Sequence, residues 1–153
     1  MIRTLPALAL LALAGCPTAS THRPELELRL AAAPAALRAG DTLRLTAVLA
    51  NPHAEPVEVE ARCTPLVVFG VGAADRSRTA HRSADPWMCG VAGPRFRIAP
   101  GDSVRFEDRW VADGDGAFTV TASIGEHYVV RAERRAFKIG HAFAPVTVRV
   151  APR

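Results

Sequence analysis

The chain has 153 residues and carries 19 Lys and Arg against 15 Asp and Glu, a formal net charge of +4 at pH 7. That length suits one domain with a single hydrophobic core. Acidic and basic residues are interspersed along most of the sequence, and Lys138 is the single lysine. This balance gives little reason to expect a nucleic-acid partner.

The first 15 residues have the outline of a secretory leader. Arg3 precedes an apolar stretch from Leu5 to Leu13, which is too short to span a bilayer as a helix. Two small residues then lead into Cys16. This pattern resembles the signal of bacterial lipoproteins, in which the cysteine is lipidated and becomes the first residue of the mature protein. An ordinary signal peptide cut nearby is the alternative.

The lipoprotein resemblance implies three segments: a signal peptide at 1–15, the lipidated Cys16 with a polar tether at 16–24, and a folded domain at 25–153. It also implies a cell-envelope location, with the protein anchored by lipid on the periplasmic or extracellular face of a membrane. Several acyl chains, at about 0.8 kcal/mol per buried methylene, make such an anchor essentially permanent.

Most of the remaining sequence alternates apolar and polar residues with a period of two, which is typical of strands with one buried face. Residues 31–39 are predicted as a connection because Pro34 interrupts them. Ala73 to Pro86 loses the pattern and is interpreted as a long surface loop or a weak hairpin. The predicted strands lie at 25–30, 42–50, 56–62, 66–71, 103–110, 118–124, 127–131, 136–139 and 146–150.

Short strands separated by turn residues, without a convincing amphipathic helix, favour an all-β antiparallel sandwich, and an immunoglobulin-like arrangement fits best. Pro100-Gly101 has the residues that a type II turn needs at its two central positions. Asp113-Gly114-Asp115-Gly116 is predicted as a hairpin connection, because a calcium loop needs more oxygen ligands and a terminal acid. Asp108 breaks the apolar face of its strand.

Cys16 apart, the chain has two cysteines, Cys63 and Cys89. In an exported protein this pair is predicted to form a disulfide. The two residues are 26 positions apart (89 − 63), and closing such a loop stabilises a fold by roughly 3 to 4 kcal/mol. The alternative is a metal site of Cys63, His81 and Cys89, but no closely spaced pair of ligands supports it.

Two features are candidate binding surfaces. Trp87, next to Cys89, is either an exposed recognition residue or a side chain packed over the predicted disulfide. Arg131, Arg134 and Arg135 gather near one predicted hairpin. They either face an acidic partner or anionic headgroups, or protect a solvated sheet edge by their charge.

Motifs for catalysis are missing from the sequence. Gly70-Val71-Gly72 lacks the third glycine and the following helix of a phosphate-binding loop, and Ser103 beside Asp102 lacks a positioned histidine. Glu126 and His127 are interpreted as a polar hairpin tip rather than an acid and base pair. We therefore expect no enzyme activity, no cofactor and no metal.

The segment from Ile98 to Phe106, followed by Trp110, Gly116 and Phe118, resembles the BsuPI-type intracellular proteinase inhibitor domain. That family shows a Pro-Gly-acid-Ser turn, a Trp four residues after a Phe, and a later strand. The resemblance extends over roughly residues 43–124, with Asp102 in place of the commoner Glu and Phe118 in place of the usual Tyr. It implies a β-sandwich and inhibition of a protease.

Three functions follow from these observations. The leading one is a membrane-anchored, non-catalytic module that binds another envelope protein or has a structural role. The second is the proteinase inhibitor that the BsuPI resemblance implies. The third is a metal-binding or enzymatic envelope protein.

Overall fold

The computed structural model describes residues 26–61, 63–83, 88–89, 95–124, 128–132, 135–137 and 143–153. For residues 61, 63–64, 88–89, 128–132 and 135–137 it describes the backbone alone. All the regular secondary structure in these ranges is β-strand. The described part of the chain holds no helix that could span a bilayer.

Three long strands form the first sheet, in the order β1-β3-β10 with all pairs antiparallel. These are β1 (Glu27–Ala33), β3 (Thr42–Ala50) and β10 (Ser103–Val111). The central strand β3 explains why the sheet forms: its alternate residues Leu43, Leu45, Ala47 and Leu49 are all completely buried. One face of the sheet thus covers the core and the other meets solvent.

The second sheet has five strands in the order β2-β14-β11-β6-β7. Its pairs are antiparallel except β2 with β14, which is parallel. Because β1 ends before Pro34 and β2 follows in the other sheet, the chain changes sheets at this point. The strands are β2 (Ala36–Arg38), β14 (Val146–Ala151), β11 (Gly116–Ile124), β6 (Val67–Ala73) and β7 (Thr79–Arg82).

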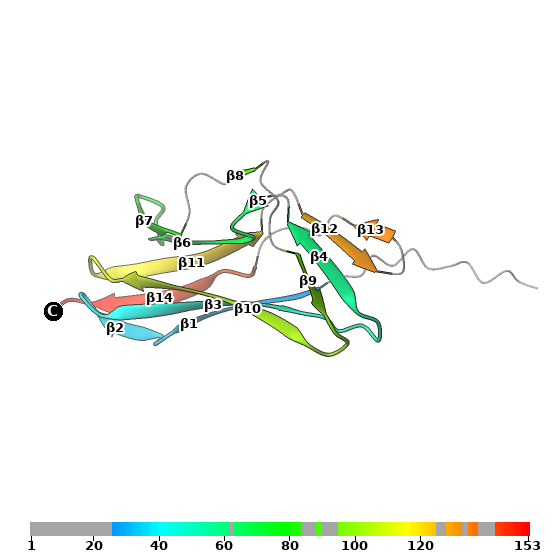
Figure 1. Cartoon of the computed structure of the whole chain (residues 1–153). Helices are drawn as coiled ribbons and strands as arrows, with labels where there is room; N and C mark the ends of the chain where they lie inside the picture. Colours follow the sequence, from blue (N-terminus) through cyan, green and yellow to red (C-terminus); the bar gives the residue numbers. More distant parts are fainter. Residues whose placement is uncertain are drawn as a thin grey trace, which may run out of the picture.

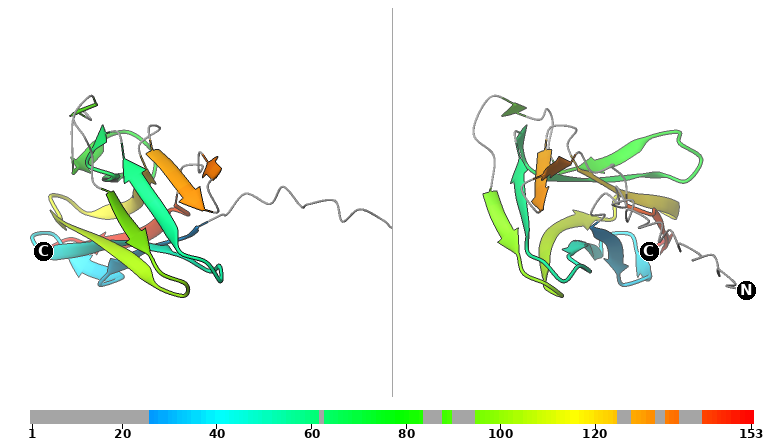
Figure 2. Two further views of the ribbon diagram at one scale, coloured as in Figure 1. Left: turned by 45° about the vertical axis from the view of Figure 1, so that its right-hand side comes forward. Right: turned by 90° about the vertical axis from the view of Figure 1, so that its right-hand side faces the viewer.

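A third, smaller sheet lies at one end of the sandwich (Figure 1) and is turned relative to the two main sheets (Figure 2). Its order is β13-β12-β4-β9. The chain reaches it three times, each time between strands of the sandwich. Its strands are β13 (Arg135–Phe137), β12 (Tyr128–Ala132), β4 (Val57–Ala61) and β9 (Arg95–Ile98). Beside it, β5 (Cys63–Thr64) pairs with β8 (Met88–Cys89).

Most of the core lies between the two main sheets, and Val57, Val59 and Ile98 of the third sheet join it. Trp110 of β10 packs against Phe118 of β11, with ring centroids 4.9 Å apart, and both rings are buried. Burial of each large apolar side chain stabilises the fold by about 1.5 to 3 kcal/mol. The predicted all-β fold with antiparallel sheets in a sandwich is therefore confirmed, as are strand 42–50 and the terminal strand near 146–150.

The Pro100-Gly101 turn is also confirmed: Gly101 has φ +74° and the Asp102 amide donates to the carbonyl oxygen of Ala99 over 3.0 Å. Such a turn needs a positive φ at its third residue, which glycine adopts without steric cost. The chain here turns from β9 into β10, and so passes from the third sheet into the first.

Two sequence predictions were wrong, and of the two alternatives for 73–86 the hairpin is the one that the structure shows. Residues 31–39 are not a plain connection, because β1 continues to Ala33 and β2 buries Leu37. In the stretch 73–86, β7 pairs with β6 as a hairpin with a bulge between Val71 and Gly72. Asp113 to Gly116 does not close a hairpin, because β10 and β11 belong to different sheets. Asp-Gly residues mark a tight turn, but they do not specify which sheet the next strand joins.

Candidate functional site

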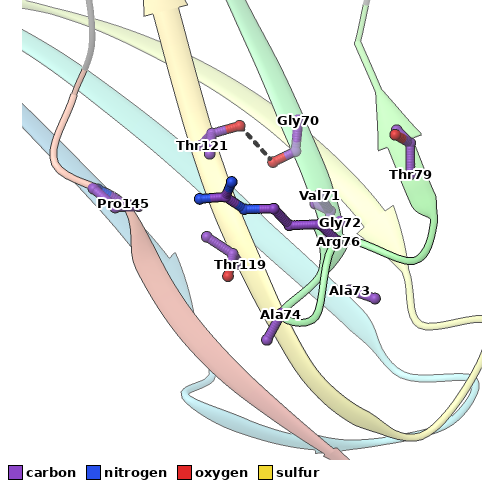
Figure 3. Close-up of a pocket in the computed structure, with 10 residues that line it drawn as sticks. All are labelled: Gly70, Val71, Gly72, Ala73, Ala74, Arg76, Thr79, Thr119, Thr121 and Pro145. Carbon is purple, nitrogen blue, oxygen red and sulfur yellow. Dashed lines mark hydrogen bonds between the residues drawn. The ribbon is translucent and has the colours of Figure 1, made fainter.

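A groove of about 440 Å³ lies on the outer face of the five-stranded sheet (Figure 3). Its floor is made where β6 and β11 pair, with Gly72 opposite Thr119 and Gly70 opposite Thr121. Alternate residues of a strand point to the same face, so both glycines leave this face without a side chain. Thr119 and Thr121 contribute short side chains with hydroxyl groups. The hollow is thus a direct consequence of residue size in two neighbouring strands.

The glycines also serve the packing of the sheet. A Cβ atom on Gly70 would lie 2.9 Å from Thr121 Oγ1, and one on Gly72 would lie 3.3 Å from the carbonyl oxygen of Arg78. The Thr121 hydroxyl itself donates to the Gly70 carbonyl oxygen at 3.4 Å (Figure 3). Larger residues at these two positions would therefore both fill the groove and displace its walls.

Arg76 brings a positive charge to this groove from the turn between β6 and β7. Its backbone has φ +63°, and its amide donates to the Ala73 carbonyl oxygen at 2.9 Å. The turn is held further by Asp75, whose side chain accepts from the Ser77 amide at 2.9 Å. Hydrogen bonds from the Ser77 side chain and backbone lower the pKa of the Asp75 carboxyl. The turn thus fixes the point from which the Arg76 side chain starts.

The Arg76 guanidinium extends over β11 between Thr119 and Thr121 (Figure 3). It makes no hydrogen bond or ion pair with any described residue. Pro145, before β14, closes the other side of the groove. Together these residues offer a flat floor, two hydroxyl groups and an unpaired cation. This arrangement suits an extended or flat ligand with an acidic group, since guanidinium pairs well with carboxylate.

A side-chain pair bridges the two main sheets at their open edge. His81 Nε2 of β7 lies 2.6 Å from Asp108 Oδ2 of β10, and the two side chains are 23% and 25% exposed. Asp108 stands on the inward side of its strand, where an acid needs a partner. His81 is therefore engaged by a carboxylate here. Among the side chains that the structure describes, no group of three metal-ligating residues occurs.

A second ion pair joins the turn after β6 to the turn after β10. Arg78 Nη1 lies 3.0 Å from Asp113 Oδ2, and the Arg78 guanidinium lies 5.3 Å from the centre of the Phe118 ring. The hydrogen bond with Arg78 lowers the pKa of Asp113. Gly114 allows this approach, because a Cβ atom there would lie 2.8 Å from Arg78 Nη2. These contacts hold in place the turn between β6 and β7, which carries Arg76 at the edge of the groove.

The structure places some of the predicted site residues and leaves others outside the described ranges. Cys16, Trp87 and Arg134 lie outside them, as do Glu126 and His127. Cys63 of β5 stands directly opposite Cys89 of β8. Opposite residues of an antiparallel pair have Cα atoms about 4.5 to 5.5 Å apart, a separation that a disulfide spans.

Two of the predicted basic residues lie on the third sheet. Arg131 of β12 is in register with Glu58 of β4, and Arg135 of β13 is in register with Ala132. Glu58 in turn accepts a hydrogen bond from Arg95 at 3.0 Å, and this bond raises the pKa of the Arg95 guanidinium. Charges of both signs thus alternate across the strands here, which favours the interpretation of a charged, solvated sheet.

Sequence reasoning missed the groove because it tested Gly70-Val71-Gly72 only as a phosphate-binding loop. Two glycines at alternate positions inside a strand are a signal for close approach of a ligand or another backbone. Asp108 was also a usable signal, since an acid on an apolar face indicates a partner. The identity of that partner, His81, depends on how the two sheets pack.

No family model and no curated protein matches this chain. Among solved structures it is similar to the ApaA protein of Bordetella pertussis, with 13% identity, a TM-score of 0.48 and coverage of 82% of this chain and 95% of that one. For the CARDB domain of a Pyrococcus furiosus protein the values are 10%, 0.45, 84% and 89%. The alkylpurine DNA glycosylase AlkC of Pseudomonas fluorescens gives 10% and 0.43, and the match spans 82% of this chain but 30% of AlkC. Likenesses this distant assign no activity or ligand.

Proposed function

We propose that this chain is a membrane-anchored envelope lipoprotein whose β-sandwich binds an acidic, extended segment of another envelope protein and catalyses no reaction. The groove between β6 and β11 carries the proposal. Its glycine floor admits the backbone of a partner, and the guanidinium of Arg76, which pairs with no residue in the described ranges, selects an acidic side chain beside it. The anchor is proposed from the sequence around Cys16.

Binding to the groove is tested by cross-linking in envelope fractions with the full-length chain. Thr119→Gln fills the floor of the groove without adding charge. Its control is Thr46→Gln, a change at an equally half-buried threonine in the central strand of the other sheet. We expect a partner that cross-links to wild type and to the control variant but not to Thr119→Gln. Equal capture by both variants would count against the groove as the binding site.

The charge of the groove is tested separately by Arg76→Asn. Asparagine tolerates the positive φ of this position better than most residues, so the turn is kept while the guanidinium is removed. Arg105→Asn, at an exposed arginine of the other sheet, is the matched control. Loss of the partner with Arg76→Asn alone supports recognition of an acidic group. Retention of the partner would show that the groove does not select for charge.

The anchor has its own test. Cys16→Ser removes the thiol that the lipoprotein resemblance implies as the acceptor of lipid. We expect the variant to leave the detergent phase or to remain an uncleaved precursor. A variant that stays lipid-modified and correctly processed would refute the anchor, whatever the groove binds.

A second candidate function is inhibition of a protease, and the turn between β9 and β10 favours it. Residues 99–103 are exposed, and the buried Asn51 fixes them from behind through bonds to the Ile98, Ala99 and Asp102 backbone. A preorganised, exposed segment loses little conformational freedom when it binds. Titration of the full chain against a panel of serine proteases tests this, with Asp102→Arg as the variant expected to lose inhibition.

A further inference from the structure

Two arginines stand directly opposite each other on the outer face of the three-stranded sheet. Arg44 of β3 and Arg109 of β10 are in register, and both are exposed. Opposite residues of an antiparallel pair have Cβ atoms about 4.5 to 5.5 Å apart, and like charges at that distance destabilise the sheet. The fold therefore places two positive charges side by side, at a pair of positions where an arginine and an acidic residue would attract each other.

The other arginines on this face do have acidic neighbours. Arg29 Nε lies 3.1 Å from Glu27 Oε1, and Arg105 Nη1 lies 3.9 Å from Glu107 Oε1. The guanidinium groups of Arg44 and Arg109 differ from them. Neither makes a hydrogen bond or an ion pair with any residue in the described ranges.

A hollow of about 560 Å³ adjoins the two guanidinium groups. The neighbouring strand β1 ends here at Ala33 and is followed by Pro34, and the small side chains of these two residues leave room beside Arg44. Thr42, two residues before Arg44 on the same face, adds an exposed hydroxyl group. Small apolar groups thus form one wall, and hydrogen-bond donors form the other.

We propose that Arg44 and Arg109 together bind a dianionic oxyanion, a phosphate monoester, in this hollow. Two guanidinium groups match two negative charges, and each can donate two parallel hydrogen bonds to the phosphate oxygens. Bound phosphate also removes the repulsion between the two arginines. The apolar wall of Ala33 and Pro34 takes the organic part of the ester, which inorganic phosphate lacks.

This site is independent of the groove described above. It lies on the first sheet, whereas the groove lies on the outer face of the second. The hollow lies at the far end of β1, because Ala33 is six residues after Glu27 and so about 20 Å from the start of that strand. The proposal holds whether or not the groove binds a protein segment, and its test uses different residues.

The test is calorimetric titration of the full-length chain, in detergent and phosphate-free buffer, with phenyl phosphate, inorganic phosphate and acetate. We expect phenyl phosphate to bind more tightly than inorganic phosphate, and acetate to bind most weakly. Arg44→Gln and Arg109→Gln should each weaken phenyl phosphate binding by about tenfold, the loss of one charged hydrogen-bonding partner. Arg105→Gln, on the same face but beside Glu107, should leave it unchanged.

Thermal unfolding without ligand shows whether the variants fold. Because either substitution relieves like-charge repulsion, Arg44→Gln and Arg109→Gln should unfold at temperatures equal to or above that of wild type at low salt. At the same concentration, phenyl phosphate should then raise the midpoint of wild type more than that of these variants. Absence of phenyl phosphate binding to wild type, equal binding of acetate, or an equal loss with Arg105→Gln would each overturn the proposal.

Discussion

The hydrogen bonds of Asn51 and the His81–Asp108 bridge both connect segments that are distant in the sequence, but the two sets of contacts differ in exposure and in charge. Asn51 is 1% exposed, and its side-chain nitrogen, Nδ2, donates to the carbonyl oxygens of Glu55, Ile98 and Ala99 at 2.7 to 3.3 Å. His81 and Asp108 are about a quarter exposed and contact each other through their side chains.

The difference shows how one sandwich uses two kinds of polar contact. The neutral amide of Asn51 bonds to the backbone at the corner where the chain leaves the sandwich after β3 and returns to it after β9, and so fixes the path of the chain. Its Oδ1 accepts from the His53 amide as well. The His81–Asp108 bridge instead holds two sheet edges together. Removing the first should leave buried backbone groups unpaired, and removing the second should leave groups that water reaches.

The largest effect is expected at Asn51. Asn51→Ala removes the donor that three carbonyl oxygens share, and should lower the free energy of unfolding by roughly 3 to 5 kcal/mol. Urea denaturation measures it. Asn51→Asp should be worse still at neutral pH, because a buried carboxylate would face carbonyl oxygens, and should recover in part in acid. A loss below about 1 kcal/mol would mean that water replaces the amide.

A covalent link between β5 and β8 is the next largest predicted contribution. If Cys63 and Cys89 are joined, Cys63→Ala with Cys89→Ala should cost roughly 2 to 4 kcal/mol and leave a folded sandwich. Limited proteolysis should then cut first between β7 and β9, the segment that the bond would restrain. Counting thiols with and without reductant precedes both measurements. Two free thiols in the native protein, purified without reductant, would refute the disulfide.

The sequence predicted those elements whose side chains decide their structure locally. In β3 and β14 an apolar residue stands at every second position, and most of the residues between them are polar, so the period of two located both strands. Gly101 likewise marked its turn because few other residues adopt a positive φ. The sequence did not predict which strands pair with one another. The turn at Asp113 was located, but nothing in its residues indicates that β11 crosses to the second sheet.

The candidate sites depend on register, which explains why the sequence did not reveal them. Arg44 and Arg109 are 65 residues apart (109 − 44) and face each other only because β3 pairs with β10. Gly70 and Thr121 meet in the same way, through the pairing of β6 with β11. Alternation assigns each residue to a face of its strand, whereas the neighbour on the next strand follows from the whole fold.

The His81–Asp108 bridge should contribute less than either Asn51 or a disulfide. Water reaches both side chains, so Asp108→Ala should lower the free energy of unfolding by about 1 to 2 kcal/mol. His81→Ala should cost a similar amount. The double variant should cost less than the sum, with a coupling energy of about 1 kcal/mol between the two positions. Additive losses would show that the two side chains do not stabilise the fold through their mutual contact.

The smallest effect, and the one most sensitive to solution conditions, is expected at Arg78 and Asp113. The hydrogen bond from Arg78 lowers the pKa of Asp113 below its usual value of 3.8. A carboxyl group whose pKa is lowered on folding stabilises the fold above its unfolded pKa, and this contribution disappears as the pH falls through the folded value. The stability advantage of wild type over Asp113→Asn should therefore be present at pH 7 and be lost in acid, as the pH falls through the lowered pKa of Asp113.

Salt and one neighbouring variant separate this ion pair from other causes. The two side chains are 43% and 50% exposed, so screening at about 1 M salt should remove most of the advantage at pH 7. Gly114→Ala places a Cβ atom against Arg78 Nη2 and should displace the guanidinium, abolishing the pH dependence while keeping the carboxyl group. A pH dependence that persists in Gly114→Ala would place its origin outside the Arg78 contact, whereas its loss identifies the guanidinium as the cause.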